Sequence, residues 1–197
     1  MRALVEYAQT QPNAHVAAVV SNNPDAAGLA FAQAQGIATT VVRHQDYASR
    51  ADFDVALMAQ IDQYAPDVVF LAGFMRILTA DFTKHYARRM FNIHPSILPS
   101  FKGLHTHQAA LDAGVKVHGA TVHGVTAELD HGPIVLQSAV PVLADDTADT
   151  LAARVLKTEH RIYPQVLDWW LHDRLVWNDD GIRVLPDAAQ VYFESSQ

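Results

Sequence analysis

The sequence contains no cysteine, no run of basic residues and no long hydrophobic segment. The lack of cysteine excludes disulfides, thiol nucleophiles and cysteine-ligated zinc. The 14 Lys and Arg residues are scattered among 21 Asp and Glu, giving a formal net charge of −7, whereas proteins that hold nucleic acid through its phosphates carry a basic patch. No stretch approaches the roughly 18 consecutive apolar residues of a membrane-spanning helix. We therefore expect a cytoplasmic protein whose partners are small molecules, with no nucleic acid and no membrane.

The remaining composition is that of a globular protein. Half of the 197 residues are hydrophobic and 18% are charged, so we expect a single domain over residues 1–197 with a sizeable core. Apolar, β-branched runs alternate with segments of helical periodicity. The expected strands are 15–20, 37–42, 67–73, 90–94, 117–126 and 133–142, and the expected helices are 2–10, 24–34, 51–64, 79–86, 106–113 and 147–172. This alternation predicts an α/β fold with a mainly parallel, doubly wound sheet and helices on both faces.

In such sheets ligands bind at the carboxyl ends of the strands, where this sequence places an Asn and a His. Asn92 and His94 are two residues apart near the end of an expected strand, so their side chains lie on the same face. An amide can donate a hydrogen bond to a developing oxyanion, and an imidazole can transfer a proton near neutral pH, a combination suited to acyl transfer. Taken alone, each residue more often has a structural role, in which Asn92 caps a turn and His94 bonds the backbone.

Other polar residues near the expected strand ends are also candidates. Asp130 lies in a loop between two strands and could orient His94, although an acid in an Asp-x-Gly turn is common. Arg76 follows a buried strand and could pair with a substrate carboxylate, lie over an aromatic ring or lie at the surface with a buried stem. The chain has 11 histidines, and a metal site could be sought among His105, His107, His118 and His123. His105 and His107 lack the spacing of a metal-binding pair on a helix, so we expect no metal and expect some of these histidines to support the active-site strands by hydrogen bonding.

The segment FNIHPSILPS at residues 91–100 resembles the signature of the folate-dependent formyltransferases. The segments at 65–69, 72–78, 103–107, 118–123 and 128–133 match at the spacing of family members that act on glycinamide ribonucleotide. The resemblance covers nearly the whole chain. It implies transfer of a formyl group from the co-substrate 10-formyltetrahydrofolate to the amine of glycinamide ribonucleotide, a step of purine biosynthesis, with no metal.

The resemblance also implies roles for individual residues. Asn92 and His94 would stabilise and protonate the tetrahedral intermediate, and Asp130 would pair with His94 and help remove the proton of the attacking amine. Glu159 and His107 would contact the nucleotide substrate. The residues expected to bind the folate are Arg50, Met75, Arg76, Ile77, Leu78, Asn92, Val125, Thr126, Ala127, Glu128 and Asp130.

One departure from the family pattern concerns the first residues. Family members begin with a strand and a Gly-rich loop before the first helix, whereas residues 1–4 already match that helix. We therefore expect a sheet that lacks its first strand, with the flanking strands missing a hydrogen-bonding neighbour. The loop would hold the phosphate of the nucleotide. The natural protein is thus expected to be longer, and the chain by itself to bind nucleotide weakly and to be poorly stable.

Four other functions deserve comparison. A formyltetrahydrofolate deformylase usually carries an additional N-terminal regulatory domain, and a methionyl-tRNA formyltransferase needs a basic tRNA-binding domain that a net charge of −7 does not suit. A non-catalytic folate-binding remnant would explain the missing loop but not the retention of Asn92, His94 and Asp130. A general α/β scaffold would explain none of the motif spacing. Either a monomer or a homodimer is compatible with the sequence.

Overall fold

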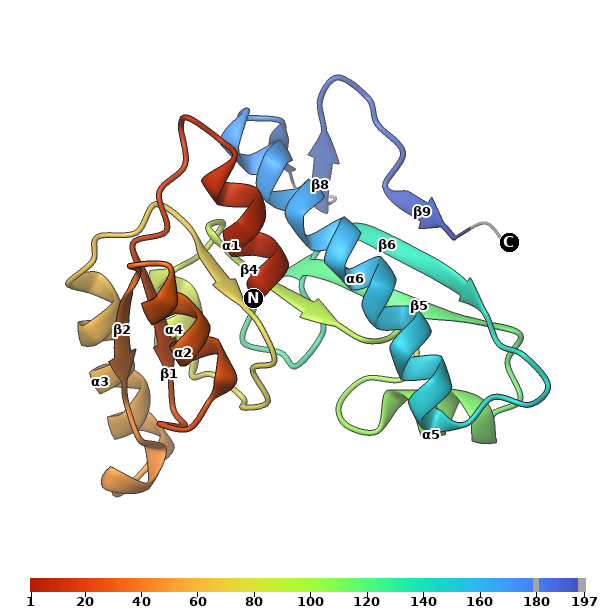
Figure 1. Cartoon of the computed structure of the whole chain (residues 1–197), viewed down its shortest axis with the longest axis horizontal. Helices are drawn as coiled ribbons and strands as arrows, with labels where there is room; N and C mark the ends of the chain where they lie inside the picture. The colour runs from red at the N-terminus through yellow and green to blue at the C-terminus, as the bar shows by residue number, and fades with distance from the viewer. Residues whose placement is uncertain (179–180, 195–197) are drawn as a thin grey trace.

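The computed structural model describes residues 1–178 and 181–194 (Figure 1). The helices are α1 (Arg2–Gln9), α2 (Ala27–Ala34), α3 (Arg50–Asp62), α4 (Ala80–His85), α5 (Thr106–Asp112) and α6 (Ala148–Leu171), with a 3-10 turn η1 (His44–Asp46). The strands are β1 (Ala18–Ser21), β2 (Ala38–Val41), β3 (Val69–Leu71), β4 (Met90–His94), β5 (Val117–Gly124), β6 (Ile134–Pro141), β7 (Leu175–Asn178), β8 (Gly181–Val184) and β9 (Val191–Phe193). The predicted α/β fold is confirmed, with element ends shifted by a few residues.

The strands form three groups. A five-stranded sheet has the order β3-β4-β5-β6-β9, while β1 pairs with β2 and β7 pairs with β8. The predicted parallel pairing is present between β1 and β2, between β3 and β4, and between β6 and β9. Strands β4, β5 and β6 pair antiparallel, so the larger sheet is mixed. A loop of nine residues joins β5 to β6 as a hairpin, which fixes their antiparallel direction.

Strands β1 and β3 each have an open edge. In the described residues β1 pairs only with β2, and β3 only with β4. The residues of both strands are half-buried, whereas seven of the eight residues of β5, which is paired on both edges, are buried. Figure 1 shows β1 and β2 beside the larger sheet rather than within it. Each of these two strands therefore leaves one edge without a hydrogen-bonded neighbour among the described strands.

The larger core lies between the sheet and the helices α1 and α6, which run over the same face (Figure 1). Leu151, Val155 and Ile162 of α6 are at most 2% exposed and pack in one cluster with residues of β5, β6 and α1. A capping box formed by Thr147 and Thr150 starts α6, and the helix continues through Pro164.

A second core lies against the opposite face of β4. Met90 belongs to this second cluster, whereas its neighbour Phe91 belongs to the larger one, as alternation along a strand requires. Side chains of α3 and α4, including Phe53 and Phe82, fill the second cluster. Asn92 and His94 share the parity of Met90, so β4 presents them on the α3 and α4 side of the sheet.

Candidate functional site

The end of β4 carries the two predicted strand-end residues. His94 is 6% exposed, and its Nε2 donates a hydrogen bond to the carbonyl oxygen of Phe101 at 3.0 Å. Its other ring nitrogen, Nδ1, lies 3.5 Å from Oδ2 of Asp130. The structure therefore brings His94 and Asp130 together across 36 residues of sequence. The carboxylate orients the ring and places a negative charge beside the nitrogen that would carry a transferred proton.

The loop that carries Asp130 is held in an unusual conformation. Asp130 has a φ of 48°, in the left-handed region that non-glycine residues seldom adopt. Its Oδ2 accepts a hydrogen bond from the backbone N–H of Gly103 at 3.0 Å. Two residues later, a Cβ on Gly132 would lie 1.8 Å from the carbonyl oxygen of Gly124. The close approach that only glycine permits at position 132 thus supports a strained loop whose carboxylate faces His94.

A second histidine completes the site. His123 is 3% exposed and lies directly opposite Asn92 in the pairing of β4 with β5. Its Nδ1 donates to the carbonyl of Gly124 at 2.9 Å, and burial lowers its pKa, so the ring is neutral with a free lone pair on Nε2. That Nε2 accepts a hydrogen bond from the amide Nδ2 of Asn92 at 3.4 Å and lies 3.8 Å from Oδ1 of Asp130.

The hydrogen bond to His123 fixes the amide of Asn92. One amide hydrogen is used by His123, which leaves the second free for a ligand. Asn92 Oδ1 is buried and has no hydrogen-bond partner in the described part of the chain. A buried polar atom without a partner is costly, so this amide is suited to a bound molecule. Asn92 could be recognised as a candidate from the sequence, but its pairing with His123 could not, because that pairing depends on strand register.

His118, which is buried, and His107, which is half-buried, pack edge to face near His94. Their ring centroids are 5.2 Å apart with the planes at 85°. Burial lowers the pKa of His118 to about 4, and burial together with the neighbouring His94 lowers that of His107. Both rings are therefore neutral near pH 7. In residues 1–178 and 181–194 no group of three or more His, Asp or Glu side chains is placed to hold a metal ion. A substrate contact for His107 remains a prediction.

The folate is predicted to bind two loops, the first at residues 75–78 and the second at residues 125–130. Both loops contact the second core. Leu78 is 7% exposed, and with Phe74 and Val125 it packs on the cluster between β4, α3 and α4. Met75 and Ile77 are 73% and 46% exposed, so this loop presents two apolar side chains to solvent. The remaining residues of the second loop, Thr126, Ala127 and Glu128, are exposed and precede Asp130.

The two predicted arginines are associated with α3. The guanidinium of Arg76 lies over the ring of Phe53, 5.1 Å from its centroid. Arg50 is the first residue of α3 and is exposed. It lies one turn before Phe53, so both arginines are near the same end of the helix.

Glu159 lines a separate hollow on the opposite face of β4. This hollow, of about 300 Å³, is bounded by Met1, by Leu4 of α1, by Gly73 and Ile93, and by Glu159 and Tyr163 of α6. Burial raises the pKa of Glu159, and the amine of Met1 partly offsets that effect. Ile93 lies between Asn92 and His94 but points to the other face, so the end of β4 separates the two regions.

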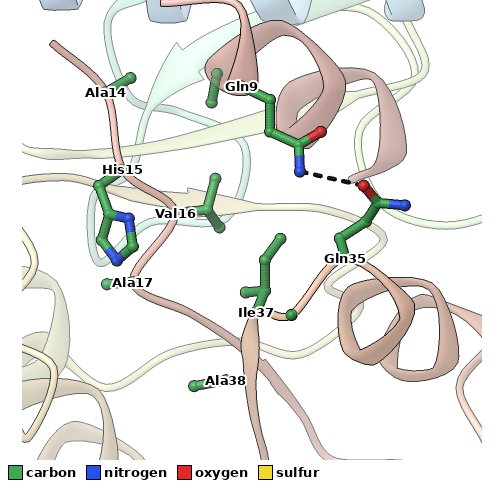
Figure 2. A pocket seen from close by; sticks show the side chains of 10 residues that line it. Gln9, Ala14, His15, Val16, Ala17, Gln35, Ile37 and Ala38 are labelled. Atoms are coloured by element: carbon green, nitrogen blue, oxygen red, sulfur yellow. Dashed lines mark hydrogen bonds between the residues drawn. The ribbon is translucent and has the colours of Figure 1, made fainter. Parts of the chain in front are cut away.

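Another hollow, of about 330 Å³, lies between the end of α1 and the segments 14–17 and 35–38. Figure 2 shows Gln9 closing one side of it, where its Nε2 donates to Oε1 of Gln35 at 3.2 Å. Its lining contains none of the predicted site residues.

Comparison with known proteins then identifies the family. The family model described as formyl transferase matches residues 2–167. The chain belongs to the formyl transferase family. It is 50% identical over 179 residues to the phosphoribosylglycinamide formyltransferase of Escherichia coli strain K12. The aligned region covers 88% of this chain and 84% of that protein.

Solved structures agree with this assignment. The phosphoribosylglycinamide formyltransferase of Coxiella burnetii superposes with a TM-score of 0.90 at 41% identity, covering 98% of this chain and 92% of that one. A formyltetrahydrofolate deformylase of Pseudomonas syringae superposes with a TM-score of 0.82 at 28% identity, covering 93% of this chain and 62% of that one. The comparisons therefore favour a transferase over the deformylase alternative.

Proposed function

We propose that this formyltransferase moves the formyl group of 10-formyltetrahydrofolate to the amine of glycinamide ribonucleotide. The observation that carries the proposal is the assembly of Asn92, His94 and Asp130 at one strand end, with His94 Nδ1 3.5 Å from the carboxylate. The 50% identity to an enzyme named for this reaction supports the choice of substrate.

The reaction follows from the chemistry of these groups. The amine nitrogen attacks the formyl carbon, and the carbonyl oxygen becomes an oxyanion that accepts a hydrogen bond from the free amide N–H of Asn92. Such a donor contributes about 3–4 kcal/mol to lowering the barrier. His94 and Asp130 take part in moving the proton lost by the amine to the departing folate nitrogen, as the tetrahedral intermediate breaks down. A positioned acid–base group contributes roughly 10²–10⁴ in rate.

The binding regions are assigned on the same basis. The folate lies against Met75 and Ile77, with Arg76 and Arg50 toward its glutamate, and the loop 125–130 closes over it. Glu159 and His107 contact the nucleotide. The protein acts in the cytoplasm as a monomer or homodimer, with small molecules as its partners. In the described residues no helix is long and apolar enough to cross a membrane.

A formyl-transfer assay tests the proposal. Loss of 10-formyltetrahydrofolate is followed with and without glycinamide ribonucleotide, for the wild type, His94→Ala and the surface control His172→Ala. Turnover that requires the ribonucleotide, disappears in His94→Ala and persists in the control supports the transferase. Consumption of folate without the ribonucleotide would establish the deformylase instead. Binding of folate with no turnover of either kind would leave the non-catalytic remnant.

A further inference from the structure

We propose that Asp54 is a positioning residue that holds the folate loop, defined here as residues 73–79. Asp54 is only 2% exposed, although it lies on a helix whose neighbouring residues Asp52 and Val55 face solvent. Its Oδ2 accepts a hydrogen bond of 2.7 Å from the backbone N–H of Thr79. A bond this short to a carboxylate is among the stronger kinds in proteins. The buried carboxyl group thus fixes the point where the folate loop ends.

Thr79 transmits this restraint to the next helix. Its side chain caps α4 by accepting a hydrogen bond from the N–H of Phe82 at 3.4 Å, and Phe82 is fully buried. The N–H of Thr79 itself lies outside the helix, and Asp54 is its acceptor. Asp54 therefore joins α3 to the start of α4 at one backbone position.

The residue before Asp54 holds the same loop at a second position. Phe53 is 1% exposed and supports the guanidinium of Arg76 at 5.1 Å. Tyr47 packs against Phe53 with ring centroids 5.9 Å apart, so the aromatic support is itself held. Two consecutive residues of α3 consequently anchor positions 76 and 79 of the loop.

Between β3 and α4 the loop has no helical or strand hydrogen bonding of its own. Its exposed members Met75 and Ile77 lie before and between the two anchors, and they are the apolar residues proposed to contact the folate. Because the backbone around them has few other restraints, the anchors set where these side chains stand. The proposal rests on the folate being the ligand of this loop.

A purely structural role for Asp54 makes a different prediction. If Asp54 only stabilised α4, its loss would reduce the amount of folded protein and leave folate affinity unchanged. If it positions the loop, Asp54→Ala raises the KM for 10-formyltetrahydrofolate about tenfold or more, with kcat within about threefold and the KM for ribonucleotide unchanged. Asp54→Asn keeps an acceptor oxygen of the same shape and restores most of the loss.

The chain offers a matched control on the same helix. Asp62, at the other end of α3, accepts a hydrogen bond of 2.8 Å from Tyr86 just beyond α4 and lies 2.9 Å from His85. Asp62→Ala therefore removes a carboxylate that also joins α3 to α4, but away from the folate loop. It should lower stability without changing the KM for folate. Equal changes of KM in Asp54→Ala and Asp62→Ala would overturn the proposal.

A second pair of variants tests the same bond from the donor side. Thr79 has a φ of −71°, which proline can adopt. Thr79→Ala removes the side-chain cap alone, whereas Thr79→Pro removes the cap and the N–H. A larger rise in KM for proline than for alanine supports the proposal, and equal effects contradict it. This pair keeps the test decisive if Asp54→Ala does not fold.

Hydrogen exchange separates this proposal from the proposed function. In the ligand-free wild type the amide of Thr79 should be protected, and exchange across residues 74–79 should rise at least tenfold in Asp54→Ala but not in Asp62→Ala. Unchanged exchange would reject Asp54 as the anchor. If the wild type consumes no folate while Thr79 is still protected through Asp54, the proposed function fails and the anchoring is retained.

Discussion

The side-chain amide of Asn92 donates to Nε2 of His123 across strands β4 and β5, at 3.4 Å. This bond decides which way the amide faces, because His123 is neutral and its Nδ1 is already bonded to the carbonyl of Gly124. A reversed amide would set its oxygen against the lone pair of Nε2 and would turn both N–H groups toward the position now held by Oδ1.

The first prediction concerns this pair. His123→Ala should lower kcat about tenfold or more by releasing the amide, and Asn92→Ala should lower it about 10²–10³-fold by removing the donor. If His123 acts through Asn92, the double variant should be little worse than Asn92→Ala. The kcat values of the two single variants and the double variant form the cycle. Fully additive losses would show that His123 contributes independently of the amide.

The second prediction concerns the charge of Asp130. Asp130→Asn keeps the shape and an oxygen to accept from Gly103 but removes the negative charge 3.5 Å from His94. We expect kcat to fall about 10²–10⁴-fold with a smaller change in KM, because the charge assists proton movement more than binding. Steady-state kinetics and a thermal melt measure the two effects. Wild-type kcat with a lowered melting temperature would assign Asp130 a structural role only.

Much of the fold could be predicted because the governing signals are local. Apolar β-branched runs and helical periodicity placed the main elements, and alternation along one strand placed Asn92 and His94 on the same face. The direction of pairing of β4, β5 and β6 could not be read in the same way. Strands buried on both faces have similar apolar sequences whether their neighbours are parallel or antiparallel.

The pairings of site residues that sequence reasoning could not assign depend on distant contacts. His123 is 31 residues from Asn92 in sequence, and it contacts Asn92 only because of the register in which β4 pairs with β5. Asp54 reads as one of several acids on α3, and its burial is decided by α4 and the loop that precedes it. No local pattern contains such information. The loop alone made Asp130 one candidate among two readings, and the resemblance, which compares whole motifs, implied that it pairs with His94.

The third prediction uses two glycines. A Cβ on Gly132 would lie 1.8 Å from the carbonyl oxygen of Gly124, whereas a Cβ on Gly114 would meet nothing within 4 Å. Gly132→Ala should force the loop that carries Asp130 to move, with a loss of roughly 2 kcal/mol or more in unfolding free energy and a large fall in kcat. Gly114→Ala controls for a change at a glycine, since its φ of 68° makes it strained, at about 1 kcal/mol. Equal kcat values for the two variants would contradict the account of the loop.

The fourth prediction concerns acid stability. His118 is 1% exposed, and burial lowers its pKa from 6.5 to about 4. The unfolded chain therefore binds this proton at a higher pH than the folded protein, so the stability is fully present above about pH 6.5 and is lost as the pH falls toward 4. The loss from His118 alone amounts to about 3 kcal/mol, and the lowered pKa values of His107 and His123 act in the same direction.

His118→Phe isolates this contribution, because a phenyl ring fits between Phe101 and His107 but cannot take up a proton. The unfolding free energy of the wild type and the variant, measured by urea denaturation between pH 4 and pH 7.5, should converge or cross as the pH falls. The variant should show the flatter curve, since it lacks one of the buried groups that bind protons only on unfolding. Parallel curves would mean that His118 already carries its proton in the folded protein, or that acid unfolding is governed by other groups.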